Sequence, residues 1–386
     1  METYNSIISK PIPLCEPNLN GNEKSYIVDS IDSNWLSAGS YLNLFEKKLS
    51  EFTGASYAIG TSSGTTALQI SLILAGVELN DLVLIPNLTF VATANSIKYI
   101  GADPILIDVD PHTWVIDLEL LKHFFINQTY LHGEYYYHKE SNRRIKAVIP
   151  VHLLGNMCDM SELIQMSAMY RFTIIEDAAC SLGSFQNSKH SGTFGLAGTI
   201  SFNSNKIITT GGGGAILTND EFIAKKARHL ISQAKSSNIE YFHDSLGFNY
   251  RLVNPLAAIG AAQMELLPGF LERKKDIKDY YIKHLKLTEN QFQIISPNTI
   301  SNFWHFVLLT KNSRELISFL AKEKIESRPL WIPINELPVF KDDIYITQKN
   351  YSKNLSSNGI MLPCSTSITD EQLSKVCNCI EKFFNQ

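Results

Sequence analysis

Short apolar runs alternate with longer amphipathic segments between residues 55 and 220. The runs are "YAIGTS", "LVLIP", "PILIDVD", "KAVIPVH" and "FTIIEDAA", and helix-like segments such as "GTTALQISLILAGV" and "TFVATANSIKYIG" separate them. Brief apolar runs with helices between them are typical of βαβ units and of a largely parallel sheet buried on both faces. We therefore predict an α/β fold, with ligand sites where the strands end at small or polar residues.

Later stretches depart from this rhythm. "ELLKHFFINQTYLHGEYYYHKESNRRIKAV" is Tyr-rich and charged, without a clear period, and predicts an inserted hairpin or long loop. From Asn254 the apolar spacing is helical, and we expect Pro268 and Gly269 to kink or break that helix. Shorter strands and helices follow, with a terminal helix from about Asp370. We predict a large domain over residues 1–254 and a smaller C-terminal α/β domain, with its linking helix, over 255–386.

Composition and charge exclude several classes of partner. The 386 residues carry a net charge of −4, and the Lys and Arg residues are dispersed, which gives no footprint for nucleic acid. No apolar run approaches the roughly 18 residues that span a bilayer, and the first residues lack a secretion signal. The six cysteines form no C-x-x-C pair, which is typical of reduced thiols. We expect a cytoplasmic protein without membrane or nucleic-acid partners, in which Cys377 and Cys379 pack on the terminal helix.

Two charged positions at strand ends suggest chemistry. "IIEDAAC" ends an apolar run with Glu176 and Asp177, and only one of these acids can face a strand-end site, because side chains alternate along a strand. An isolated acid there is as easily a helix cap or an ion-pair partner. Lys206 ends another apolar run, "ISFNSNKII", and precedes four glycines at 211–214. An amine and a carboxylate in one such site suit pyridoxal phosphate, whose aldehyde forms a Schiff base with lysine while an acid keeps the ring nitrogen protonated.

Other stretches carry weaker signals. "GTSSGTTAL" opens a helix whose free N–H groups favour an anion such as phosphate, although Ser and Thr are ordinary helix caps. Phe90 follows a strand and suits either a ring cover or the core, and Asn249 and Arg251 lie in a polar turn where Arg suits phosphate or carboxylate. His152 and the acids of "DVD" at 108–110 lack matching ligand spacing. We predict no metal, and interpret them as a strand-end histidine and solvated turn acids.

Taken in order, these stretches resemble the DegT/DnrJ/EryC/StrS family of sugar aminotransferases, which are pyridoxal-phosphate enzymes with the aspartate aminotransferase fold. The resemblance runs from "NWLSAG" through "EDAA" and "SFNSNKIITTGGGG" to "LPCSTSITDEQ", nearly the whole chain. It implies the type I fold of these transferases, a three-layer αβα large domain that binds the cofactor and a smaller C-terminal α/β domain.

The resemblance also assigns roles. Lys206 becomes the Schiff-base lysine and proton carrier, Asp177 the partner of the pyridine nitrogen, and Phe90 the residue stacked on the ring. Asn249 matches a residue that reaches the phosphate of the neighbouring site, which implies a homodimer with shared active sites. The remaining expected contacts are Gly64, Thr65 and Ser201 with the cofactor phosphate, Cys180 with the cofactor, and Trp35, Arg251, Arg328 and Trp331 with the substrate.

Two positions depart from the family pattern. Cys180 stands where Gln, Glu or His usually hydrogen-bonds the ring hydroxyl of the cofactor, and a thiol is a weak partner for that oxygen. Asn335 stands where a His is expected in "WIPINELP".

The motifs look most like the branch that moves an amino group from L-glutamate, leaving 2-oxoglutarate, to C4 of a UDP-linked 4-keto-6-deoxy-N-acetylhexosamine for bacterial surface glycans. The GDP-perosamine synthases are the alternative. A sugar dehydratase carries His in place of Lys206, and a catalytically silent cofactor- or nucleotide-sugar-binding regulatory protein is the remaining rival.

Overall fold

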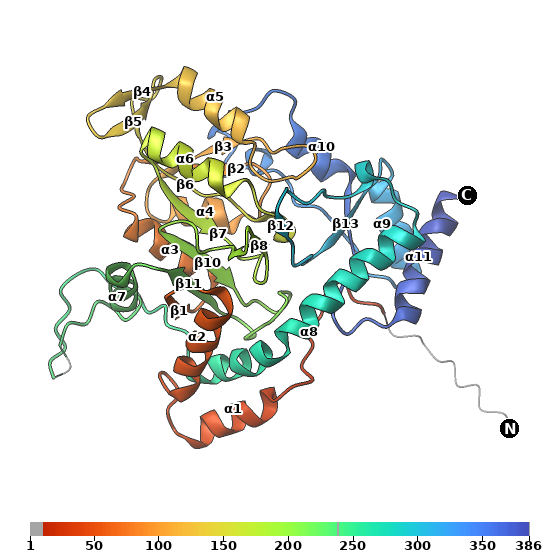
Figure 1. Cartoon of the computed structure of the whole chain (residues 1–386), viewed down its shortest axis with the longest axis horizontal. Coiled ribbons are helices and arrows are strands. Elements are labelled where there is room, and N and C mark those ends of the chain that lie inside the picture. Colours follow the sequence, from red (N-terminus) through yellow and green to blue (C-terminus); the bar gives the residue numbers. More distant parts are fainter. Residues whose placement is uncertain (1–10, 238, 386) are drawn as a thin grey trace.

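The computed structural model describes residues 11–237 and 239–385, so part of the expectation about the N-terminus concerns residues outside this range. A ten-stranded sheet forms its centre (Figure 1). Its main path runs β1 (Tyr57–Thr61), β11 (Gly214–Thr218), β10 (Ala197–Ser201), β7 (Thr173–Asp177), β6 (Arg144–Val148), β2 (Leu82–Pro86), β3 (Asp103–Ile107) and β15 (Ile344–Ile346). Both antiparallel pairings on this path involve β11, and all the others are parallel, which confirms a mostly parallel sheet.

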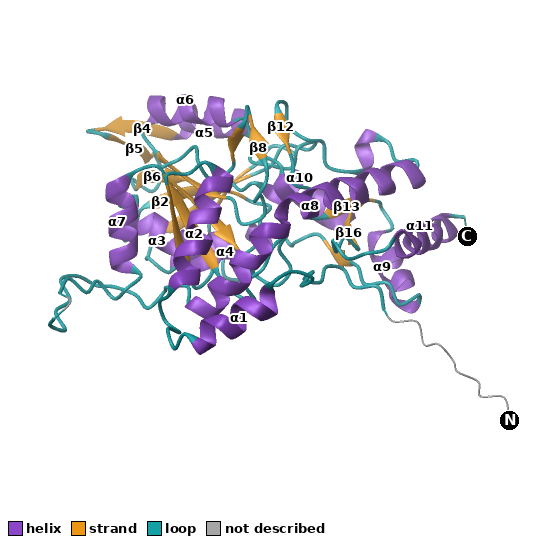
Figure 2. Ribbon diagram, turned by 60° about the horizontal axis from the view of Figure 1, so that its bottom comes forward, coloured by secondary structure: helices purple, strands orange, loops and turns teal. Residues whose placement is uncertain are grey.

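Helices cover both faces of the sheet, because successive side chains of each strand point to opposite faces (Figure 2). Along β2, Leu84 packs among residues of the helices on one face, and Val83 among those on the other. One face is covered by α3 (Gly64–Leu74), α4 (Ala92–Lys98) and α7 (Glu221–Leu230), and the other by α2 (Ser40–Thr53), α5 (Leu118–Gln128), α6 (Met160–Tyr170) and α8 (Asn254–His284). This arrangement confirms the predicted three-layer αβα architecture.

The inserted segment is a helix followed by a hairpin. Strands β4 (Thr129–His132) and β5 (Tyr135–His138) pair with each other, and β5 also pairs with β6, so the predicted hairpin is confirmed. The prediction placed no helix in this segment and was wrong there, since residues 118–128 form α5. The side chain of Asp117 caps this helix by accepting a hydrogen bond from the backbone N–H of Leu120 at 2.9 Å.

Helix α8 runs from α2 and α1 (Glu23–Asp32) to the C-terminal part of the chain (Figure 1). It is continuous through Pro268, so the expectation of a break there was wrong. The proline removes one backbone donor. Packing holds the helix on both sides of it: Leu267 and Phe270 are buried, and Glu265 accepts hydrogen bonds from Tyr26 of α1 and Lys48 of α2.

The C-terminal part has its own sheet, in which β16 (Gly359–Leu362) pairs antiparallel with β13 (Phe306–Leu309) and β14 (Arg328–Pro329). Helices α9 (Ser313–Lys322) and α11 (Asp370–Phe384) pack near it, and Cys377 and Cys379 are buried on α11 as predicted. Strand β15, by contrast, joins the central sheet beside β3. The division of the chain at residue 254 stays a prediction. The remaining elements are α10 (Tyr351–Asn358), β8 (Phe185–Gln186), β9 (Lys189–His190), β12 (Thr299–Ile300), and the 3-10 helices η1 (Leu153–Gly155), η2 (Glu289–Gln291) and η3 (Ile334–Glu336).

Asp108, expected as a solvated turn acid, is buried at the end of β3. Its carboxylate accepts hydrogen bonds from the Thr347 hydroxyl at 2.6 Å and from the backbone N–H groups of Tyr351 and Ser352 at 2.8 and 2.9 Å. Asp108 therefore anchors the start of α10. Among the described residues, no helix has the length and apolar character needed to cross a membrane.

Candidate active site

A cavity of about 340 Å³ opens at the carboxyl ends of the parallel strands, where the sequence predicts a site. Its walls come from the turn after β1, the turn after β2, the end of β7, and the segment from Ser201 to Gly213. Eight of the predicted site residues line this cavity: Gly64, Thr65, Phe90, Asp177, Cys180, Ser201, Lys206 and Trp331. Residues up to 267 positions apart in the sequence, from Gly64 to Trp331, thus meet in one place.

Lys206 lies half-buried in the turn that follows β10. Its backbone N–H bonds to the carbonyl of Asn203 at 3.0 Å, which fixes the turn. Its amine donates to the sulfur of Cys180 at 3.2 Å and stands 3.7 Å from the ring centroid of Trp304. A thiol and an aromatic ring hold this amine more weakly than a carboxylate would, so it is available to a carbonyl group in the cavity.

Asp177 ends β7 and points into the same cavity. One carboxylate oxygen accepts from the hydroxyl of Thr93 at 2.6 Å, and the other accepts from the backbone N–H of Ala179 at 3.1 Å. Both donors hold the carboxylate in one orientation.

Glu176 points to the other side of the strand, as the alternation predicts. Its carboxylate accepts from the backbone N–H groups of Gly192, Phe194 and Gly195, and lies 2.9 Å from Nε2 of His152. Burial by itself raises the pKa of Glu176, but the hydrogen bonds from His152 and from the backbone outweigh it and hold the pKa below its ordinary value. Glu176 therefore fixes the loop before β10, and Asp177 alone of the pair faces the cavity.

The N-terminus of α3 forms one wall. Ser63 caps the helix: its hydroxyl accepts from the N–H of Thr66, whose own hydroxyl accepts from the N–H of Ser63, both at 3.1 Å. The N–H groups of Gly64 and Thr65 stand in the first turn, where the helix supplies no acceptor for them. A Cβ atom on Gly64 would lie 2.9 Å from the Cβ of Ser201, so the two residues are packed together. This end of α3 suits a phosphate group.

Two of the four consecutive glycines have distinct structural reasons. Gly211 has a φ of +82°, a left-handed conformation that glycine adopts without strain. Gly214 lies against the cap of α3, and a Cβ there would come within 2.4 Å of the carbonyl carbon of Ser63. The glycine run thus lets the strand after Lys206 approach the backbone of the phosphate wall.

The two departures from the family pattern have clear surroundings. Burial raises the pKa of Cys180, against the opposing effect of Lys206, so the residue stays a thiol. Asn335 forms a reciprocal pair with Asn87: its Oδ1 accepts from the Asn87 side chain at 2.8 Å, and its backbone N–H donates to Asn87 Oδ1 at 3.0 Å. Asn335 therefore joins η3 to the turn after β2.

A second cavity of about 770 Å³ adjoins the first. Phe90 and Trp331 line both cavities, with their ring centroids 6.2 Å apart. Arg328 lines only the second cavity and pairs with Glu326 at 2.9 Å. Arg328 is therefore near the first cavity without belonging to it.

Three predicted residues lie outside both cavities: Trp35, Asn249 and Arg251. Trp35 is 70% exposed in the loop after α1. Asn249 is exposed, and its backbone forms an isolated β-bridge with Ser232. The backbone of Arg251 forms one with Thr61 at the end of β1. Their roles stay predictions.

Three residues of the site escaped the sequence analysis: Ser63, Thr93 and Trp304. The helix cap pattern of "GTSSGTTAL" identifies Ser63 in retrospect, because Thr follows it three positions later. Thr93 and Trp304 have no comparable local signal. Their contacts with Asp177 and Lys206 arise from tertiary packing.

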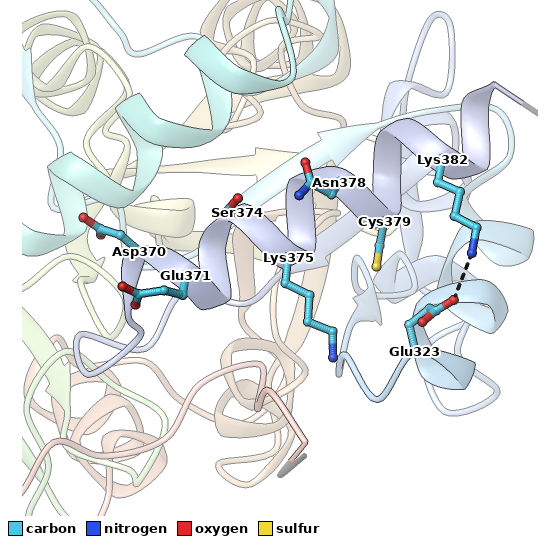
Figure 3. A pocket seen from close by; sticks show the side chains of 8 residues that line it. All are labelled: Glu323, Asp370, Glu371, Ser374, Lys375, Asn378, Cys379 and Lys382. Atoms are coloured by element: carbon cyan, nitrogen blue, oxygen red, sulfur yellow. Dashed lines mark ion pairs between the residues drawn. The ribbon is translucent and has the colours of Figure 1, made fainter. Parts of the chain in front are cut away.

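A third hollow lies on the surface of α11 (Figure 3). Its lining is mostly charged and polar, with Lys382 of α11 paired to Glu323 at 3.6 Å. Its acids at the start of α11, Asp370 and Glu371, make that helix end unsuited to an anion, unlike the start of α3 in the first cavity. Within residues 11–237 and 239–385, no group of three or more His, Cys, Asp and Glu side chains is arranged to hold a metal ion.

Comparisons with known proteins agree with this geometry. Residues 17–381 match the DegT/DnrJ/EryC1/StrS aminotransferase family. The chain is 35% identical to the GDP-perosamine synthase of Escherichia coli O157:H7, over 97% of this chain and 99% of that relative, and 33% identical to that of Vibrio cholerae, over 97% and 99%.

Among solved structures, a DegT DnrJ EryC1 StrS aminotransferase from Brucella abortus superposes with a TM-score of 0.86 at 26% identity, covering 95% of this chain and 96% of that one. An amine, an opposed carboxylate and a helix N-terminus around one cavity fit the aldehyde, ring nitrogen and phosphate of pyridoxal 5'-phosphate. This chain belongs to the DegT/DnrJ/EryC1/StrS aminotransferase family and is a pyridoxal-phosphate-dependent sugar aminotransferase.

Proposed function

We propose that this enzyme transfers the amino group of L-glutamate to C4 of a GDP-linked 4-keto-6-deoxy sugar, as a step in the synthesis of a surface polysaccharide. The observation that carries the nucleotide assignment is the match of the whole chain to two GDP-perosamine synthases at 33–35% identity. The UDP-linked N-acetyl sugar that the motifs suggest is the second candidate.

Residues of the first cavity divide the work. When bound, pyridoxal phosphate supplies an aldehyde and a ring that accepts electrons. Lys206 carries a proton between carbon atoms of the reactants, since its amine is the basic group that the thiol of Cys180 and the ring of Trp304 leave free. Asp177, with its carboxylate oriented by Thr93, would pair with the ring nitrogen and keep it protonated. Phe90, at 56% exposed, would cover one face of the ring.

The second cavity takes the nucleotide sugar. Phe90 and Trp331 line both cavities, so a sugar held in the second would lie beside the first. Arg328 stands on its rim with a guanidinium group suited to a diphosphate, and Glu326 orients that group. We assign the diphosphate to Arg328 on this basis.

We further propose a homodimer in which Asn249 completes the neighbouring site. Asn249 lies outside the cavity of its own chain, on a segment that also exposes Tyr241 and Leu246 at 92% and 83%. Exposed apolar side chains of this extent favour a protein interface. Light scattering measures the assembly, and an Asn249→Ala variant is expected to bind cofactor more weakly without losing the dimer.

A substrate panel tests the proposed reaction. GDP-, UDP- and dTDP-linked 4-keto-6-deoxy sugars are each mixed with enzyme, cofactor and L-glutamate, and 2-oxoglutarate formation is measured, with Lys206→Ala as the inactive control. We expect the highest kcat/KM with the GDP-linked sugar. Preference for the UDP-linked N-acetyl sugar would overturn the nucleotide assignment alone, and no 2-oxoglutarate with any sugar would overturn C4 amination.

A further inference from the structure

A thiol, an imidazole and an ammonium group meet in the interior beside the second cavity. The ammonium of Lys274, on α8, is 2% exposed and donates to the backbone carbonyls of Trp304 at 2.8 Å and Cys364 at 2.6 Å. It also reaches the sulfur of Cys364 at 3.5 Å, and Nδ1 of His305 lies 3.0 Å from the same sulfur. The acceptors around this buried cation are two carbonyls and a sulfur, which favours a negative charge on that sulfur.

Cys15 lies next to this group. The backbone N–H of Cys364 donates to the carbonyl of Leu14 at 2.8 Å, and the N–H of Glu16 donates to the Ser365 hydroxyl at 2.9 Å, so the two segments are held side by side around the two cysteines. The Cys15 and Cys364 side chains are neighbours, since each changes the pKa of the other. Cys15 is half-buried and lines the 770 Å³ cavity together with His305, which gives a small solute a route to Cys15, beside the buried Cys364.

The two thiols differ in acidity. The neighbouring Cys15 side chain, the charge of Lys274 and the imidazole of His305 lower the pKa of Cys364 in spite of its burial. The neighbouring Cys364 side chain, together with burial, raises the pKa of Cys15. The pair therefore combines a nucleophilic sulfur with a neighbouring thiol that can resolve its oxidised form.

We propose that Cys15 and Cys364 form a redox-sensitive dithiol, which a peroxide converts to a disulfide that slows the adjacent transamination site. The Cys364 thiolate attacks one oxygen of hydrogen peroxide, the O–O bond breaks, and Cys364 becomes a sulfenic acid; the departing hydroxide takes up the proton that the Cys364 thiol had released and leaves as the first water. The Cys15 sulfur then displaces the hydroxyl group from Cys364, forming the S–S bond and releasing the second water with the Cys15 proton. The two thiols lose two electrons and the peroxide gains them, and a small dithiol reverses the change.

The carbonyl group of Asn205 links Cys15 to the active site. The Cys15 thiol donates to the carbonyl of Asn205 at 3.2 Å, and Nε1 of Trp304 donates to the same oxygen at 2.7 Å. Asn205 precedes Lys206, and the Trp304 ring is the one that faces the Lys206 amine. Oxidation removes the Cys15 donor and leaves Nε1 of Trp304 as the remaining donor to this carbonyl. This regulatory consequence rests on the proposed function, whereas formation of the disulfide does not.

Peptide mapping tests the disulfide without any substrate. Purified full-length protein is treated with hydrogen peroxide, its free thiols are alkylated under denaturing conditions, and its peptides are identified by mass. All six cysteines start as free thiols, so we expect the count to fall by two, from six to four, with one cross-linked peptide that joins Cys15 to Cys364. Six free thiols after a dose that oxidises free cysteine in the same tube, or a cross-link between other positions, would overturn the proposal.

Variants assign the two roles. Cys15→Ser is expected to stop at a sulfenic acid on Cys364, which dimedone traps, and Cys364→Ser to leave Cys15 unoxidised at the same dose. Cys379→Ser, on α11 (Figure 3), is the matched control and is expected to keep the cross-link. If Cys364→Ser does not fold, the peptide map of the unaltered protein still tests whether the disulfide between Cys15 and Cys364 forms. Oxidation of Cys15 in the Cys364→Ser variant, together with a Cys364 that stays reduced in the Cys15→Ser variant, would refute the assignment.

Turnover tests the regulatory step. Loss of the Cys15 hydrogen bond, worth about 1 kcal/mol, corresponds to a loss of about fivefold in rate, restored by dithiothreitol. Each protein is compared with its own reduced form, and Cys379→Ser is expected to respond like the unaltered enzyme. A complete cross-link with unchanged turnover would overturn the regulatory step. A reduced enzyme inactive on every sugar, with the cross-link still forming, would count against the proposed function instead.

Discussion

Replacement of Gly214 by alanine tests whether the glycine run supports the phosphate wall. The added Cβ would lie 2.4 and 2.5 Å from the carbonyl carbon and oxygen of Ser63, and 2.6 Å from the backbone nitrogen of Gly64. These are backbone atoms at the capped start of α3, so relief requires movement of the helix end itself. Overpacking of this kind costs about 1–3 kcal/mol. The same movement displaces the N–H groups of Gly64 and Thr65, and a loss of about 1.4 kcal/mol there weakens cofactor binding about tenfold.

Two measurements separate these effects. Urea unfolding of the cofactor-free protein gives the change in the free energy of unfolding, and absorbance titration gives the dissociation constant of pyridoxal phosphate. Gly212→Ala is the matched control for unfolding, because no atom lies within 4 Å of the Cβ it would add, and we expect a change of less than about 0.5 kcal/mol. If Gly214→Ala unfolds like this control and binds the cofactor with unchanged affinity, the close approach of Gly214 to α3 has no energetic consequence and the reasoning fails.

Three further substitutions give distinct expectations. Glu176→Gln is expected to cost about 1.5–3 kcal/mol, because an amide cannot replace a carboxylate that accepts three backbone N–H groups and His152. Since the pKa of Glu176 in the folded protein lies below the ordinary 4.5, this stabilisation is present above that pH and is lost as the pH falls through the folded pKa. If the difference in unfolding free energy between the unaltered protein and Glu176→Gln stays constant down to about pH 3, the expectation is contradicted. Asp177→Asn is expected to lower kcat about 100-fold in the transamination assay, and near-normal turnover would show that the acid is misassigned. Gly269→Ala, with open space around the new Cβ in α8, is expected to raise the unfolding free energy by about 0.5–1 kcal/mol, and destabilisation would show that the position is tighter than described.

The sequence predicted the parts of the fold and site that depend on local patterns. Alternation along β7 separated the directions of Glu176 and Asp177, and the end of the apolar run before Lys206 located that residue at a strand end. Both signals lie within a few residues of the feature they predict. The pattern of runs and helices likewise predicted the mostly parallel sheet.

Other features depend on contacts that the local pattern does not contain. Trp304 faces Lys206 across 98 positions of sequence, and Gly214 meets Ser63 across 151. Pro268 lies inside a continuous helix because α1 and α2 hold Glu265 beside it, and Asp108 is buried because the start of α10 covers it. In each case a partner distant in sequence overrides the preference of the isolated segment.

Because strand β15 comes late in the sequence, its partner β3 stays unpaired on one side during most of synthesis. It pairs with β3 through residues 344–346, which are translated long after the other strands of the central sheet's main path. Until they emerge from the ribosome, β3 is an edge strand with a row of unpaired N–H and C=O groups, the kind of edge that recruits other chains. A nascent or truncated chain that ends before residue 344 is therefore expected to aggregate even though nearly all of its sheet has been made. A strand from the last part of the sequence thus covers the exposed edge of β3, which is made early.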